Sequence, residues 1–263
     1  MNDDLLESMI NASLKAGKII RYYYKKRNLR VTEKGDHYDL VTNVDHESQS
    51  IIRKELSNRF PDISIIGEED LHITKKENAF FVDPLDGTLN FVKQIPFFAV
   101  SIGYWKNNEP LCGVVYDPLR RDLFYARKDQ GSYLNGKELH LIRNTDKYSI
   151  LLASDWGHEP RLYQKNIQIM QRLIRENSYL FRFLGCASLG ICYVGAGILD
   201  GYWHYKLSPW DMAAAVLIAQ ESGAKVSHLD GHIFDLWGEN ILAIVPDLRE
   251  KLIEAFKLDN PNR

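Results

Sequence analysis

Apolar residues near the start of the chain recur at three- and four-residue steps, at Leu5, Met9, Ala12, Ala16, Ile19 and Tyr23. This spacing places them on one face and predicts an amphipathic helix. A second helix is predicted over about 45–59, because Pro61 lies just beyond it as a stop signal.

The middle of the chain changes to short apolar runs separated by turn signals. We expect strands at 63–66, 80–82, 98–104, 112–116 and 123–126, with turns at Asn107-Asn108 and Asn135-Gly136. Successive strands of this kind predict an antiparallel meander.

The second half alternates between strand and helix patterns. Strands are predicted at 149–153, 181–184, 201–205 and 241–245, and helices at 161–176, 187–196, 209–222 and 247–256, with Gly223 as a C-terminal cap. The whole pattern predicts an α/β (α+β) chain built of layered helices and sheets. Because no linker or repeat divides it, we expect one domain over 1–263, with halves of about 1–145 and 146–263.

Composition narrows the function class. The net charge is −2, from 33 basic and 35 acidic residues, which argues against a nucleic-acid binder. The longest nearly apolar stretch, 95–105, is too short for a membrane helix, and the acidic start has no signal-peptide pattern, so we expect a cytoplasmic protein without membrane contact. Cys112, Cys186 and Cys192 form no CxxC pair and are expected to be buried, reduced thiols.

Acidic residues gather in three segments at the ends of predicted elements. Glu68-Glu69-Asp70 follows one strand, 83–91 follows another, and 208–212 begins a helix. Each segment alone has an ordinary structural explanation: a solvated loop, an Asp-Gly turn, and a capping box with Asp211 at its third helical position. Their combination favours a functional site.

The segment 83–91 combines two kinds of ligand. Pro84 favours an extended Asp83, and Gly87 can adopt a backbone conformation closed to other residues, so Asp83 and Asp86 can converge across the turn. The N–H groups of Gly87 and Thr88 would then face an anion at a helix start.

Gathered carboxylates repel one another. Two unit charges 4 Å apart repel by about 4 kcal/mol at an effective dielectric of 20, so either a carboxylate keeps its proton or a cation lies among them. Oxygen ligands alone suit Mg²⁺ rather than a softer metal.

The chain resembles the inositol monophosphatase family over nearly its whole length. The first signature of the family is matched by Asp83-Pro84-Leu85-Asp86-Gly87-Thr88-Leu89-Asn90-Phe91, and two others by Glu68 and by Trp210-Asp211-Met212-Ala213-Ala214. The N-terminal pattern of the family is matched by Lys34 and by Leu40-Val41-Thr42-Asn43-Val44-Asp45.

The resemblance implies a layered αβαβα sandwich, a homodimer, and an Mg²⁺-dependent, Li⁺-sensitive phosphatase. It implies one metal at Glu68, Asp83 and the Leu85 carbonyl, a second at Asp83, Asp86 and Asp211, and a third, weaker one near Glu68. It further implies that Thr88, hydrogen-bonded to Asp45, orients the attacking water with Glu68, and that Gly87 and Thr88 hold the phosphate.

The substrate is less closely defined. The family segment that approaches the substrate ring is matched by Gly185, Cys186 and Ala187. Animal inositol enzymes have a substrate-binding glutamate seven residues before the last metal-binding aspartate, where this chain has His204, followed by Lys206 on the same strand face. These two residues either meet a more acidic substrate or are simply polar strand residues.

Several functions therefore stay open. The main expectation is hydrolysis of inositol monophosphate or a related phosphorylated polyol or sugar. Sibling activities are those of fructose-1,6-bisphosphatase, histidinol-phosphate phosphatase and 3′-phosphoadenosine 5′-phosphate phosphatase. A different class is a binding protein that associates with the transcription machinery, as some bacterial relatives do.

Overall fold

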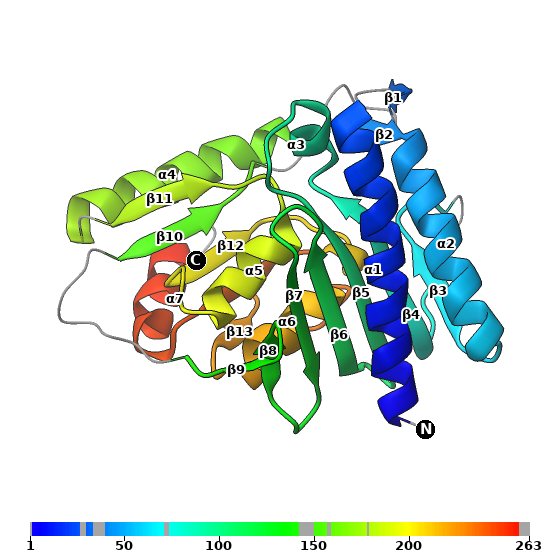
Figure 1. The fold of residues 1–263 in the computed structure, drawn as a ribbon. Helices are drawn as coiled ribbons and strands as arrows, with labels where there is room; N and C mark the ends of the chain where they lie inside the picture. Colours follow the sequence, from blue (N-terminus) through cyan, green and yellow to red (C-terminus); the bar gives the residue numbers. More distant parts are fainter. Residues whose placement is uncertain are drawn as a thin grey trace.

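Two β-sheets stacked between helices organise the chain, as the computed structural model shows (Figure 1). The structure describes residues 2–26, 30–33, 40–70, 74–141, 150–156, 159–177 and 179–257.

The larger sheet has seven strands in the order β3-β4-β5-β6-β7-β8-β9. β3 runs parallel to β4, and every other neighbouring pair is antiparallel. The predicted meander is thus confirmed from β4 onwards. The strands are β3 (Ser64–Gly67), β4 (Asn78–Asp86), β5 (Ala99–Lys106), β6 (Glu109–Asp117), β7 (Asp122–Arg127), β8 (Ser132–Leu134) and β9 (Lys137–Leu139).

The smaller sheet has five strands in the order β11-β10-β12-β14-β13. β10 is parallel to both of its neighbours, whereas β14 is antiparallel to β12 and β13. Its strands are β10 (Leu151–Ser154), β11 (Leu180–Phe183), β12 (Gly201–His204), β13 (Lys225–Ser227) and β14 (Ile241–Ile244). A separate antiparallel pair joins β1 (Val31–Glu33) to β2 (Leu40–Thr42).

Helices form three further layers. α1 (Asn2–Lys26) and α2 (Asn43–Arg59) share a buried cluster with one face of the larger sheet. α5 (Ala187–Gly195) and α6 (Pro209–Glu221) lie in a second cluster with its other face and with the smaller sheet. α4 (Pro160–Asn177) and α7 (Arg249–Lys257) cover the outer face of the smaller sheet. The layer order is αβαβα, which confirms the expected fold.

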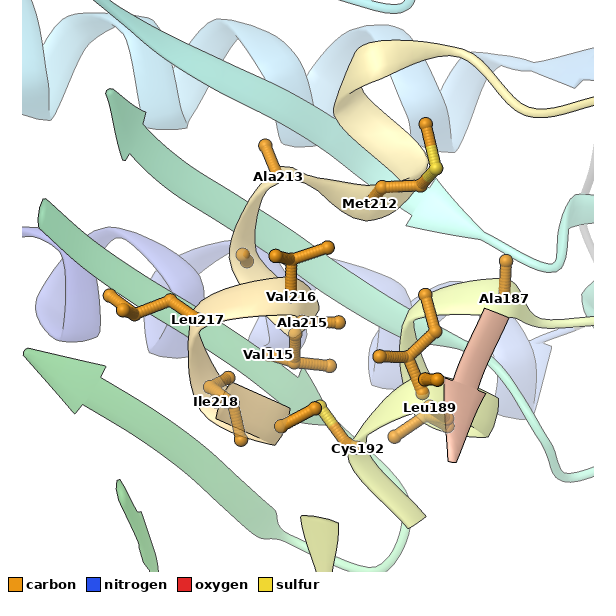
Figure 2. Close-up of a cluster of buried hydrophobic side chains, with 14 of the residues drawn as sticks. Val115, Ala187, Leu189, Cys192, Met212, Ala213, Ala215, Val216, Leu217 and Ile218 are labelled. Atoms are coloured by element: carbon orange, nitrogen blue, oxygen red, sulfur yellow. The ribbon is translucent and has the colours of Figure 1, made fainter. Parts of the chain in front are cut away.

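α6 in the central layer is apolar on all sides because both sheets enclose it. Figure 2 shows Met212, Val216 and Ile218 of this helix beside Val115 of β6 and Leu189 of α5. A helix without a polar face is stable only in such surroundings. Its alanines let it approach the larger sheet closely, and the start of α6 lies against β5, where the Ser101 hydroxyl donates to the Trp210 oxygen at 3.3 Å.

Differences from the sequence prediction are confined to short elements. The strands that were not anticipated have only three residues each: β1, β2, β8, β9 and β13. The predicted final helix is divided into a 3₁₀ turn (Pro246–Leu248) and α7. The strand predicted at 149–153 is observed as β10 from Leu151 to Ser154; Ile150 is not part of it, and residue 149 lies outside the described residues.

The three cysteines are buried and form no disulfide, as expected. Burial also raises the pKa of the Cys112 thiol to about 11, which keeps it protonated. Among the described residues, no helix combines the length and the apolar character needed to span a bilayer.

The contact between α6 and β6 predicts a stability effect. A Cβ at Gly113 would lie 2.4 Å from the backbone oxygen of Ala214, so Gly113→Ala should lower the free energy of unfolding by about 1–3 kcal/mol. Urea unfolding measures this change, with Lys106→Ala at the exposed end of β5 as the control. Equal midpoints for wild type and Gly113→Ala would show that the layers separate easily.

Candidate active site

The segment 83–91 turns from strand to helix within a few residues. β4 pairs with β5 up to Asp83 and again at Asp86, and the register shifts between these two residues, where Pro84 has no N–H to donate. Gly87 then adopts φ 88°, and α3 (Thr88–Val92) begins. The predicted turn is confirmed, and it places Asp83 and Asp86 on either side of a bulge.

Gly87 also meets the second half of the chain. A Cβ at this position would lie 2.9 Å from the backbone oxygen of Gly185, so the two segments pack backbone against backbone. The carboxylate of Asp86 accepts hydrogen bonds from the Ser188 N–H at 2.7 Å, the Ala187 N–H at 3.3 Å and the Cys186 thiol at 3.1 Å. Asp86 therefore caps the start of α5 in addition to any ligand role.

Glu68 lies next to Asp83 because β3 is parallel to β4. The N–H of Glu68 donates to the Val82 oxygen at 3.0 Å, one residue before Asp83. The nearby Asp70 serves a structural purpose: it accepts from the Gly67 N–H at 2.8 Å and pairs with Arg53 at 2.5 Å. Of the three acids at 68–70, Glu68 alone lines the cavity described below.

Asp211 reaches the same region from the first turn of α6. Ser208 is the N-cap, Pro209 begins the helix, and the Ser208 N–H donates to the Asp211 carboxylate at 2.8 Å. The predicted capping box is therefore confirmed. The capping hydrogen bond engages one carboxylate oxygen of Asp211, and this acid still lines the cavity.

One cavity of about 700 Å³ is lined by Glu68, Asp83, Asp86 and Asp211, together with Leu85, Gly87 and Thr88. Burial raises the pKa of Asp83 well above its usual range, and the charges of Glu68, Asp86 and Asp211 raise it further. Three of the acids named from the sequence thus act electrostatically on the fourth, Asp83, as the charge argument requires.

Thr88 connects this cavity to α2. Its hydroxyl lies 3.2 Å from the Asp45 carboxylate and 2.9 Å from the Leu85 oxygen, so the hydrogen bond implied by the resemblance is present. Asp45 is fully buried and is held by the Thr42 N–H at 2.8 Å and the Thr42 hydroxyl at 2.6 Å. The orientation of Thr88 is therefore set by a fixed acid at the start of a helix.

The two residues that depart from the family pattern take different places. His204 is buried, lines the cavity, and accepts a hydrogen bond at Nδ1 from the Lys206 N–H at 3.0 Å. Its neutral ring consequently carries the proton on Nε2. The Lys206 ammonium forms an ion pair with Glu159 and is not among the lining residues. Lys34 lies outside the described residues.

Asp155 lines the cavity and was not singled out from the sequence. It follows β10 and accepts hydrogen bonds from the N–H groups of Leu184 at 2.8 Å and Gly185 at 2.6 Å, and from the Tyr202 hydroxyl at 2.9 Å. An acid directly after a predicted strand was the available signal. Its structural role is to hold the segment that faces Gly87.

A hard divalent cation fits the chemistry of the donor set, because the acids and the Leu85 carbonyl present only oxygen. As the side chains lie, however, no three His, Cys, Asp or Glu residues in the described part of the chain form a cluster that could hold a metal ion. Asp86 is directed to α5 and Asp211 to the Ser208 N–H. Cation binding would therefore compete with these two capping interactions.

The stacked αβαβα layers and the carboxylate-lined cavity together are typical of a sandwich of the sugar-phosphatase type. The inositol monophosphatase family matches residues 1–258, so this chain belongs to that family. Membership supports a phosphatase of this superfamily.

Similar proteins carry two kinds of name. The Nus factor SuhB of Escherichia coli is 35% identical over 265 residues, which cover 96% of this chain and 98% of that protein. Inositol monophosphatase 2 of Mus musculus is 33% identical over 248 residues, covering 92% and 85%. The crystal structure of the extragenic suppressor protein suhB from Bartonella henselae superposes with a TM-score of 0.89 at 33% identity, covering 97% and 98%.

The buried carboxyl group of Asp155 should make the free energy of unfolding depend on pH. Burial raises its pKa from 3.8 to about 6, although its hydrogen bonds oppose the shift; Tyr202 and Asp86 are the ionisable groups facing it. Between these values the folded protein binds more protons than the unfolded chain, so stability falls as pH rises.

Asp155→Asn keeps an oxygen acceptor and removes this titration. In metal-free buffer, the unfolding free energy of wild type minus that of Asp155→Asn should fall from pH 4 to pH 6 by at most about 1.4 kcal/mol per pH unit. Chemical unfolding at each pH provides the measurement. If the unfolding free energies of the two proteins plotted against pH ran parallel, the assigned environment of Asp155 would be wrong.

Proposed function

We propose that this chain is an Mg²⁺-dependent phosphoric monoester hydrolase whose substrate is inositol monophosphate or a related sugar phosphate. The observation that carries the proposal is the meeting of four acids at one cavity, where like charges raise the pKa of the buried Asp83. Such an arrangement is costly without a cation, and family membership supports the same chemistry.

Mg²⁺ at this site would act as a Lewis acid on the phosphate and make hydroxide available from bound water near neutral pH. We assign its ligands as Glu68, Asp83, Asp86, Asp211 and the Leu85 carbonyl oxygen. These are the oxygen donors that the family resemblance implies as ligands. No nucleophilic side chain is needed, because phosphoryl transfer depends mainly on positioning and charge neutralisation.

Thr88 and Asp45 are assigned to orient the attacking water together with Glu68. The single hydroxyl hydrogen of Thr88 is directed to Asp45 or to the Leu85 oxygen. The oxygen of Thr88 can then only accept a hydrogen from water, which turns a lone pair of that water away from Thr88. We assign the N–H groups of Gly87 and Thr88 to hold the phosphate.

The substrate-side assignments are Gly185, Cys186, Ala187, His204 and Lys206. His204 in place of the glutamate of the animal enzymes weakens the case for inositol itself. The bisphosphate, histidinol-phosphate and 3′-phosphoadenosine 5′-phosphate activities therefore stay as alternatives. A substrate panel distinguishes them, because turnover of bisphosphorylated compounds alone would exclude the inositol activity.

Family resemblance also leads us to propose Li⁺ inhibition and a homodimer. Exposed Ile174 on α4 and Leu180 on the edge strand β11 support a contact between copies, since an edge with apolar side chains favours pairing. Sedimentation velocity measures the oligomeric state directly.

A second candidate function is association with the transcription machinery. It is favoured by the name of the Escherichia coli relative, a Nus factor. The net charge of −2 gives little support to direct RNA contact. Recovery of polymerase partners in a pull-down, with negligible turnover of every phosphate ester, would favour this function over hydrolysis.

Phosphate release from a panel of phosphate esters tests the hydrolase proposal. We expect turnover with Mg²⁺, loss with chelator, and inhibition by Li⁺. Asp83→Asn should lower kcat/KM at least about a thousandfold, because it removes the acid assigned to both metals. Glu254→Gln, an exposed acid of α7 that does not line the cavity, is the comparison variant and separates a metal effect from a general charge effect. Full activity in Asp83→Asn would exclude the proposed site.

Metal binding should also appear as a change in Tm. Without metal, Asp83→Asn should melt above wild type, because the substitution removes a buried acid that Glu68, Asp86 and Asp211 repel. Millimolar Mg²⁺ should raise the Tm of wild type, since a ligand bound only by the folded state stabilises it, and should leave the variant unchanged. Scanning fluorimetry with and without Mg²⁺ measures both. An equal Mg²⁺ shift in the two proteins would place the cation elsewhere.

A further inference from the structure

The cavity has an apolar end that the phosphatase chemistry does not use. Besides the carboxylates, the cavity is lined by Trp156, Tyr163, Ile167 and Phe183. Trp156 follows β10, Tyr163 and Ile167 lie on α4, and Phe183 ends β11. All of these residues come from the second half of the chain, whereas Glu68, Asp83 and Asp86 come from the first half and Asp211 comes from α6.

The aromatic residues of this end are stacked in a fixed arrangement. The rings of Trp156 and Phe183 are 4.6 Å apart and inclined by 10°, and Tyr163 meets Trp156 edge-on at 5.6 Å. Trp156 is nevertheless 38% exposed and Phe183 42% exposed. Ordered aromatic surface inside a cavity that also contains polar groups is typical of a ligand site.

We propose that this aromatic wall, made of Trp156, Tyr163, Ile167 and Phe183, binds a planar aromatic group on the alcohol side of the phosphate ester. The inference rests on the proposed function, because the phosphate is assumed to lie at the carboxylate end. A cavity of about 700 Å³ is large enough for both parts of such an ester.

The wall is a poor surface for the bare polyol of inositol monophosphate, so within the proposed class it favours a related sugar phosphate that carries an aromatic group. Each hydroxyl of a polyol that leaves water needs a hydrogen-bond partner. Asp155, the acid next to the wall, already accepts from Leu184, Gly185 and Tyr202. A flat aromatic group has no such requirement and gains from contact with Trp and Phe rings.

Two esters with similar leaving groups test this inference, since both release a primary alcohol. We expect wild type with Mg²⁺ to show a lower KM for 2-phenylethyl phosphate than for glycerol 1-phosphate. Trp156→Ala and Phe183→Ser should each raise the KM for the phenylethyl ester about tenfold and change that for the glycerol ester less than about twofold. Equal changes for both esters, or none, would overturn the aromatic site.

Leu180→Ser is the matched control, because Leu180 lies on the same edge strand, is similarly exposed and does not line the cavity. It should leave the ratio of the two KM values unchanged. If it reproduces the effect of Phe183→Ser and changes the sedimentation coefficient, the apolar surface is a contact between copies and the proposal is wrong. Circular dichroism and Tm establish that each variant is folded.

A non-hydrolysable probe separates this inference from the phosphatase proposal. Calorimetric titration with 3-phenylpropylphosphonate and Mg²⁺ should show binding that Trp156→Ala weakens about tenfold. This result without turnover of any ester supports the aromatic site and contradicts the hydrolase proposal. Turnover of the glycerol ester without phosphonate binding supports the hydrolase and overturns the aromatic site. Neither binding nor turnover overturns both.

Discussion

The burial of Asp83 among other acids that repel it is the constraint on which this structure depends. Asp83 lies in a strand packed on both faces, so it cannot turn to solvent to escape Glu68, Asp86 and Asp211. The acids stay together because rigid layers hold their strands and helices in place. Asp83 comes from β4, Glu68 from the end of its parallel neighbour, and Asp211 from a helix that the two sheets enclose.

The N-termini of three helices reduce the free-energy cost of gathering these negative charges. Asp45 and Asp211 each occupy the third position of a capped helix, and Asp86 accepts from the first N–H groups of α5. Backbone N–H groups at a helix start carry partial positive charge, which favours nearby anions. The same groups that stabilise the acids thus bring α2, α5 and α6 to one cavity, and they leave the carboxylates engaged until a stronger partner binds.

Sequence reasoning identified the acids but not the aromatic wall. The segment 83–91 and the capping box at Ser208 are local patterns, and their conformations follow from Pro84, Gly87 and Pro209 with little help from distant residues. Trp156 and Phe183 lie far apart in sequence on strand ends that are brought together only by the parallel pairing of β10 with β11. Periodicity does not determine that pairing, and three-residue strands such as β13 give too short a pattern to detect.

The arrangement divides two tasks between the two sheets. Asp83 and Asp86 lie on β4, Glu68 directly follows β3, and Asp211 lies on α6, which packs against the larger sheet, whereas the aromatic wall comes from β10, α4 and β11 around the smaller sheet. Asp155 joins the two parts, because it fixes the backbone at Leu184 and Gly185, and Gly185 packs against Gly87. Side chains at the wall can therefore vary without disturbing the acids, provided that this connection is kept. This construction allows the chemistry at the acids to stay the same while the substrate that the wall accepts changes.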